Sequence, residues 1–216
     1  MVHTEDGPVL AKAVEELTAL GRTSLEYFPD SRPVLGEAVA MQRAVAMSEQ
    51  TGAPIYAVHV SSERALRVAQ EAQGRGVPVY VETRPIYLHF TRERFEGSDR
   101  GLYVGQPPLR EQRDQNALWD GLANGSVHVV GTDHVAYTRE TKMDPSQTIA
   151  RHRAGLNNHT APVSGSVARP CMLRWPQLQI SGRAVGWPTK GLSLGTRPSS
   201  CRRTIVPMWF VRSCAG

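Results

Sequence analysis

Short apolar runs alternate with longer amphipathic stretches over the first 150 residues of the chain. Three runs rich in Val, Ile and Tyr, at 54–60, 77–83 and 127–133, have the length and composition of buried strands. A further strand is expected to end just before His3. Because buried strands that alternate with helices pair in parallel, this pattern predicts a parallel α/β fold.

Helical patterns fill the segments between these strands. One helix is expected at 9–20 and another at 110–126, and a third begins at Ser62 and ends by Gly76. Residues 34–50 form a fourth, with a broad apolar face made of Leu35, Ala38, Val39, Met41, Val45 and Ala46. Together these elements make about half of a (β/α)₈ barrel, which typically needs about 250 residues.

The composition divides the chain into two parts. Residues 1–150 contain all 20 acidic residues and 15 of the 25 Lys and Arg residues, which gives a formal charge of −5. Residues 151–216 contain ten Lys and Arg residues and no acid, which gives +10. We therefore expect a partial barrel domain over 1–150 and a separate basic tail over 151–216.

The tail shows no sustained period of a helix or a strand, so we expect it to be irregular and disordered. A basic nucleic-acid arm is disfavoured because large apolar residues interrupt the charges, as in "IVPMWFV". A zinc module is disfavoured because Cys171, Cys201 and Cys214 form no CxxC pair. Translation of a GC-rich gene in a shifted frame accounts for the abundant Arg, Pro, Ser and Gly, and we favour this hypothesis.

Segments for membrane insertion or secretion are not visible in the sequence. No apolar run approaches the roughly 18 residues that span a bilayer. The amino terminus has no basic region followed by an apolar stretch. We expect a cytoplasmic protein that binds neither membrane nor nucleic acid.

Polar side chains follow the predicted strands at their carboxyl ends. In chain order these are His3, His59, Glu82-Thr83 and Asp133. Carboxyl ends of parallel strands share one rim, where active sites form. Two imidazoles and a carboxylate suit Zn²⁺, Fe²⁺ or Mn²⁺. Taken singly, His59 is more often a hydrogen-bonded core residue and Asp133 a residue that terminates a strand or caps a helix.

Five segments carry a family resemblance: "VHTEDG", "YAVHVSSERAL", "VYVETRPIYL", "GQPPLR" and "VVGTDHVAYT". In this order they resemble the cyclic amidohydrolases of the dihydropyrimidinase and hydantoinase type, within the metal-dependent amidohydrolase superfamily. The resemblance implies the carboxyl-terminal half of a TIM-type (β/α)₈ barrel, strands five to eight with their helices. It implies hydrolysis of a cyclic amide, by ring opening of dihydropyrimidine- or hydantoin-like substrates; dihydroorotase- and allantoinase-like activities are alternatives.

The same resemblance implies a two-metal centre, with zinc as the expected metal. His3 and His59 would bind one metal, while Asp133 would bind the other and act as the catalytic proton shuttle. His134 would not be a ligand. Backbone groups near Gln106 would hold the substrate amide, unless that loop is only a rigid surface turn.

Two departures from the family pattern affect the expected activity. The His-x-His motif of the first strand and the carbamate-bearing lysine of the fourth strand are absent from this sequence. We therefore expect a chain truncated at its amino terminus, which binds at most one metal weakly and hydrolyses nothing by itself. The alternative to an enzyme is accordingly an inactive fragment or pseudoenzyme. The intact parent is expected to be a homo-oligomer, commonly a tetramer.

Overall fold

Three parallel strands form the centre of the computed structural model, which describes residues 1–155. The strands β1 (Ile55–Ala57), β2 (Val79–Thr83) and β3 (Val129–Val130) pair in the order β1-β2-β3. Both pairings are parallel. Val2 makes a single parallel bridge to Ala57, so the opening segment lies on the other edge of β1. The predicted parallel α/β architecture is confirmed.

The strands are shorter than the apolar runs that predicted them. The run at 54–60 forms a strand only over Ile55–Ala57, and the run at 127–133 only over Val129–Val130. His59 and Asp133 have φ angles of 43° and 44°, in the left-handed region. This conformation is incompatible with an extended backbone, so the two residues turn the chain away from the sheet.

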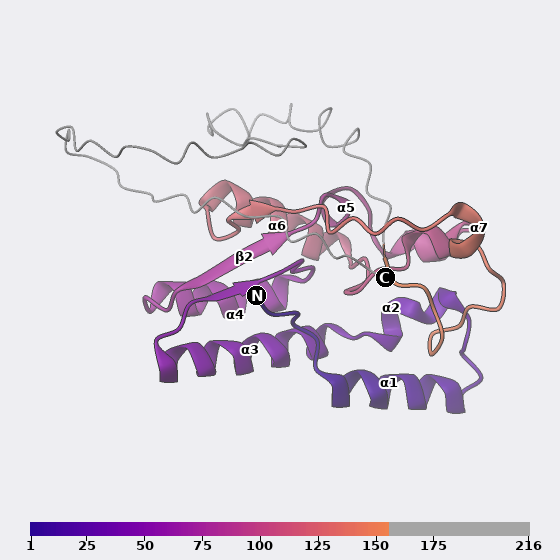
Figure 1. Cartoon of the computed structure of the whole chain (residues 1–216), viewed down its shortest axis with the longest axis horizontal. Coiled ribbons are helices and arrows are strands. Elements are labelled where there is room, and N and C mark those ends of the chain that lie inside the picture. Colours follow the sequence, from indigo (N-terminus) through magenta and orange to yellow (C-terminus); the bar gives the residue numbers. More distant parts are fainter. Residues whose placement is uncertain (156–216) are drawn as a thin grey trace, which may run out of the picture. The chain divides into compact units, whose positions relative to one another are not determined.

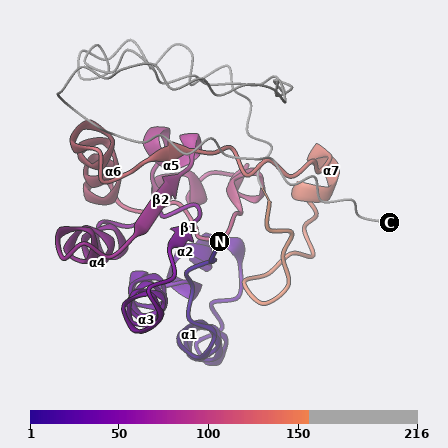
Figure 2. The same cartoon turned by 60° about the vertical axis from the view of Figure 1, so that its left-hand side comes forward.

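Long helices connect successive strands, as predicted. The helix α3 (Val34–Thr51) precedes β1, α4 (Glu63–Gly74) links β1 to β2, and α6 (Gln112–Asn124) lies before β3. The helix α1 (Gly7–Ala19) follows the opening segment. Figures 1 and 2 show α3, α4 and α6 side by side along one face of the strands.

The ends of these helices follow local sequence signals. Ser62 precedes α4, and its hydroxyl accepts a hydrogen bond from the backbone N–H of Ala65, so the predicted N-cap is confirmed. Gly125 follows α6 with a φ of 82°, a left-handed conformation that glycine adopts without steric cost. Asp114 of α6 accepts a hydrogen bond from the backbone N–H of Glu63 at 2.9 Å, which ties the start of α4 to α6.

The apolar core fills the space between the helices and the sheet. Its fully buried members include Met41, Val60, Leu66, Val81, Leu109 and Leu118. The buried face of α3 differs from the predicted one, because Leu35 and Ala46 are exposed whereas Glu37 and Ser48 are buried. The α3 helix therefore presents two polar side chains to the interior, and both make hydrogen bonds there.

Shorter elements complete the described part. They are α2 (Phe28–Ser31), α5 (Pro85–His89), α7 (Arg139–Lys142) and the 3₁₀ helices Leu25–Tyr27, Arg92–Phe95 and Arg100–Tyr103. Within residues 1–155, none of the helices is long and apolar enough to cross a membrane. The predictions for the tail concern residues that lie largely outside the described part.

Candidate active site

Two imidazole rings meet where the opening segment and β1 end. His3 Nδ1 lies 3.0 Å from His59 Nε2. The ring centroids are 4.7 Å apart and the planes are inclined by 75°. The two side chains that were predicted to share a metal are therefore brought together, with one nitrogen of each ring facing the other.

The surroundings of His59 keep its ring neutral. Its side chain is buried, and this burial together with the positive charges of His3 and Arg84 lowers its pKa to about 3. Among the described residues its Nδ1 atom has no hydrogen-bond partner. A neutral imidazole is the form that binds a metal ion, so the ring is in the protonation state that a metal ligand requires.

A carboxylate lies on the far side of His3. Glu5 Oε2 is 2.9 Å from His3 Nε2, and Arg32 donates to both oxygens of Glu5 at 3.0 and 2.7 Å. Burial alone would raise the pKa of Glu5, but the hydrogen bonds from His3 and Arg32 outweigh it and lower the pKa. Glu5 is therefore an anion at neutral pH.

Asp133 lies at the end of β3 but is not gathered with the two imidazoles. Its Oδ2 atom is 3.3 Å from Arg84 Nη1, and its side chain is 45% exposed. Across residues 1–155, no three or more His, Cys, Asp and Glu side chains are grouped so that they could hold a metal ion. The predicted role of Asp133 as a ligand and proton shuttle stays a prediction.

Glu82 connects the ends of all three strands. Its carboxylate accepts a hydrogen bond from the Tyr56 hydroxyl at 2.6 Å and another from the backbone N–H of His59. A Cβ atom at Gly131 would lie 2.6 Å from this carboxylate, so only glycine leaves room for it there. Burial, and to a smaller degree the charge of Asp133, raise the pKa of Glu82.

The loop that carries Gln106 is anchored at two points. The Gln106 amide lies 2.9 Å from His152 Nε2, and the Tyr87 hydroxyl donates to the Pro107 carbonyl at 2.7 Å. The contact with His152 was not predicted. The predicted contact of Gln106 with a substrate stays a prediction.

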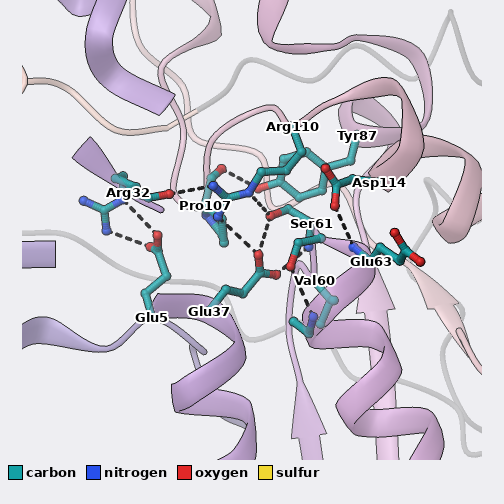
Figure 3. Close-up of polar contacts among 12 residues, drawn as sticks. Glu5, Arg32, Glu37, Val60, Ser61, Glu63, Tyr87, Pro107, Arg110 and Asp114 are labelled. Carbon is teal, nitrogen blue, oxygen red and sulfur yellow. Dashed lines mark hydrogen bonds and ion pairs between the residues drawn. The ribbon is translucent and has the colours of Figure 1, made fainter. Parts of the chain in front are cut away.

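A buried polar network joins this loop to the segment after His59 (Figure 3). The Glu37 carboxylate accepts hydrogen bonds from the backbone N–H and the hydroxyl of Ser61 at 2.7 and 2.8 Å. Arg110 donates to Ser61 Oγ at 3.0 Å and to Glu37 at 3.2 Å. Arg110 also donates to the backbone carbonyl oxygen of Arg32, and the side chain of Arg32 binds Glu5. The network thus reaches both imidazole-bearing segments.

The interpretation of the sequence missed this network. One signal was present: Glu37 lies four residues before Met41 and eight before Val45, on the face that α3 buries. A carboxylate on an apolar helical face needs a partner, because a charge is rarely buried unpaired. The sequence does not show that the partner is Arg110.

The comparisons place these features in a family context. No family model matches the chain. A D-hydantoinase of Streptomyces coelicolor is 33% identical over 208 residues, covering 88% of this chain and 43% of that protein. An allantoinase of Deinococcus radiodurans is 39% identical over 132 residues, covering 61% of this chain and 29% of that protein.

A solved structure shares the arrangement of the elements. The D-hydantoinase (dihydropyrimidinase) from Thermus sp. superposes with a TM-score of 0.71 and 32% identity, covering 77% of this chain and 38% of that one. This chain spans less than half the length of these relatives. Since 88% of 216 residues is more than 150 residues, the Streptomyces alignment continues into the tail, where the shifted-frame hypothesis stays a prediction.

Proposed function

We propose that this chain contributes to a hydrolase of cyclic amides. The premise is that it is a partial homologue of the hydantoinases and dihydropyrimidinases of the amidohydrolase superfamily. The observation that carries the proposal is the 3.0 Å approach of His3 Nδ1 to His59 Nε2 at the ends of neighbouring strands. A dihydropyrimidine or hydantoin ring is the proposed substrate. Since an allantoinase is among the relatives, an allantoin-type ring is the alternative within the class.

The proposed fold is the carboxyl-terminal half of a (β/α)₈ barrel. It is supported by the sequential parallel order of the opening segment, β1, β2 and β3, with a helix before each strand. In such a barrel the active site lies at the carboxyl ends of the strands. His3, His59, Glu82 and Asp133 all lie at those ends.

His3 and His59 would hold one divalent metal ion, most simply Zn²⁺, because two neutral imidazole nitrogens suit that ion. Their facing nitrogens and the neutral ring of His59 fit this role. When bound, such a metal lowers the pKa of a water molecule and polarises a carbonyl group. The intact family site would hold a second ion, for which residues 1–155 would contribute Asp133.

The chain's own residues would perform two further tasks. Asp133, half exposed at the rim, would accept the proton of the attacking water and pass it to the leaving ring nitrogen. Backbone groups near Gln106 would orient the substrate amide, since Tyr87 and Arg110 fix that loop from both sides. Both tasks require a rigid rim, which the buried network around Glu37 provides.

The second candidate is an inactive fragment or pseudoenzyme, and the placement of the lysines favours it. Lys142 is buried, and its amine donates to the carbonyls of Val104, Arg153 and Gly155. Lys12 lies exposed on α1. Within residues 1–155 neither amine is free to form a metal-bridging carbamate beside His3 and His59. Activity would therefore need a lysine from outside residues 1–155.

Two measurements separate these candidates. The full chain should bind at most one equivalent of Zn²⁺ and turn over neither hydantoin nor dihydrouracil; two bound metals with turnover would contradict the fragment hypothesis. A chimera then replaces the homologous segment of the Streptomyces D-hydantoinase with residues 1–150. An active chimera supports the hydrolase, whereas a folded, metal-loaded and inactive chimera supports the pseudoenzyme. Its mass in solution tests the proposed homo-oligomer.

A further inference from the structure

When both rings are neutral, the hydrogen bonds around His3 have only one consistent arrangement of protons. Each oxygen of Glu5 accepts a hydrogen bond from the Arg32 guanidinium, so Glu5 offers His3 Nε2 only an acceptor. Nε2 of His3 therefore carries the hydrogen at this 2.9 Å contact. In a neutral ring Nδ1 is then a bare lone pair, directed at His59.

The arrangement continues into His59. Nε2 of His59 lies 3.0 Å from Nδ1 of His3, which carries the lone pair, so Nε2 must be the donor of this hydrogen bond. Nδ1 of His59 is then the unprotonated nitrogen, which agrees with its lack of a partner among the described residues. If Nδ1 of His59 carried the proton instead, it would be a buried N–H group without an acceptor, which is costly.

Arg32 holds Glu5 from a rigid part of the molecule. It binds both carboxylate oxygens, and its own carbonyl accepts a hydrogen bond from Arg110 of the buried network (Figure 3). The side chain of Glu5 is 1% exposed. The carboxylate is thus buried and held at both oxygens next to His3.

We propose that Glu5, held by Arg32, is a positioning residue that locks His3 in the Nε2–H tautomer and so presents Nδ1 to the metal. Two consequences follow for the pair. In the metal-free chain both rings are Nε2–H tautomers. A metal ion that binds between them takes the place of the proton on His59 Nε2, while the proton on His3 Nε2 stays. Only this second consequence rests on the proposed function.

The test uses the full chain labelled with ¹⁵N-histidine. Long-range ¹H–¹⁵N correlation spectra distinguish Nε2–H from Nδ1–H rings, and His3→Gln and His59→Gln variants assign the two signals. We expect Nε2–H patterns for both rings without metal. After Zn²⁺ is added, only the His59 pattern should change to Nδ1–H. An Nδ1–H pattern for His3 in the metal-free chain overturns the proposal without any variant of Glu5.

Glu5→Gln tests the cause, because an amide can present either a donor or an acceptor to His3. We expect mixed His3 tautomers and a Zn²⁺ affinity about 10- to 100-fold weaker. Asp114→Asn is the control, since Asp114 is also a buried carboxylate that accepts two hydrogen bonds but contacts neither Arg32 nor an imidazole. It should leave the His3 pattern unchanged.

The outcomes separate the two proposals. A wild-type His3 pattern in Glu5→Gln, or an equal change in Asp114→Asn, overturns the role of Glu5. If Zn²⁺ changes neither ring in the wild-type chain, the proposed metal site fails. In that case the metal-free tautomers still decide whether Glu5 locks His3.

Discussion

Arg84 Nη1 lies 3.3 Å from Asp133 Oδ2, and Arg84 Nη2 donates to the carbonyl of the same residue at 3.1 Å. The arginine side chain is 1% exposed, whereas that of Asp133 is 45% exposed. A buried cation therefore holds a carboxylate that faces solvent at the rim. This pairing gives Asp133 a defined position even though its backbone has a positive φ.

Asp133→Ala should abolish turnover in the active chimera described above. Proton transfer by a positioned group contributes about 10²- to 10⁴-fold to a rate, so we expect a loss of at least that size in kcat. Asp120→Ala, which removes an exposed carboxylate of α6, is the control and should keep the rate. Normal turnover of Asp133→Ala would show that the rim assignment is wrong.

His59→Ala should weaken Zn²⁺ binding to the full chain by about 10²-fold or more, because it removes one of two proposed nitrogen ligands. Isothermal titration calorimetry, or Co²⁺ absorption as a substitute probe, measures the change. His134→Ala is the control, because His134 follows Asp133 but is predicted not to be a metal ligand. This variant should bind Zn²⁺ with the affinity of the wild type. Equal affinities for all three chains would exclude His59 as a ligand.

Arg110→Met should destabilise the chain by about 3–5 kcal/mol, because it leaves the fully buried Glu37 carboxylate without its cation. Urea unfolding of the full chain measures this loss. The double variant Glu37→Met/Arg110→Met removes both charges and should recover part of the stability. A double variant less stable than Arg110→Met would mean that the ion pair is not the source of the loss.

Lys142 should make stability depend on pH in the alkaline range. Its burial, and to a smaller degree the charge of Arg84, lower its pKa from 10.5 to about 8. Between these two pH values the unfolded chain binds more protons than the folded chain, so the free energy of unfolding rises with pH. The rise is at most about 3 kcal/mol by the linkage relation.

The measurement compares the wild type with Lys142→Met by urea unfolding from pH 7 to 10.5. The difference between the two free energies of unfolding should change in favour of the wild type above pH 8. Lys12→Met, which removes an exposed lysine, should run parallel to the wild type throughout. Parallel curves for Lys142→Met would contradict the shifted pKa.

Gly121→Ala should destabilise the chain although alanine favours helices. A Cβ atom there would lie 2.7 Å from a methyl group of Val127 and 2.9 Å from one of Leu66, so these side chains or α6 itself would have to shift. Overpacking of this kind costs about 1–3 kcal/mol, more than the gain in helix propensity of about 1 kcal/mol. Gly74→Ala at the end of α4 meets no atom within 4 Å and should be neutral or stabilising. Thermal unfolding compares the two.

The sequence by itself determined the order and type of the main elements. The helices α3, α4 and α6 and the three strands occur where apolar periodicity and glycine stops predict them. These signals are local, because the side chains that create them lie within one or two helical turns. The chain also determined which polar residues end the strands, since each follows its apolar run directly.

Only the tertiary structure decided how these residues meet. Glu37 and Arg110 are 73 residues apart, and Arg84 and Asp133 are 49 apart, so no local pattern pairs them. The positive φ angles of His59 and Asp133 depend on the same packing, and they shortened the predicted strands. Side-chain partners depend on which segments the folded core brings together, and this is a property of the whole chain rather than of any window in it.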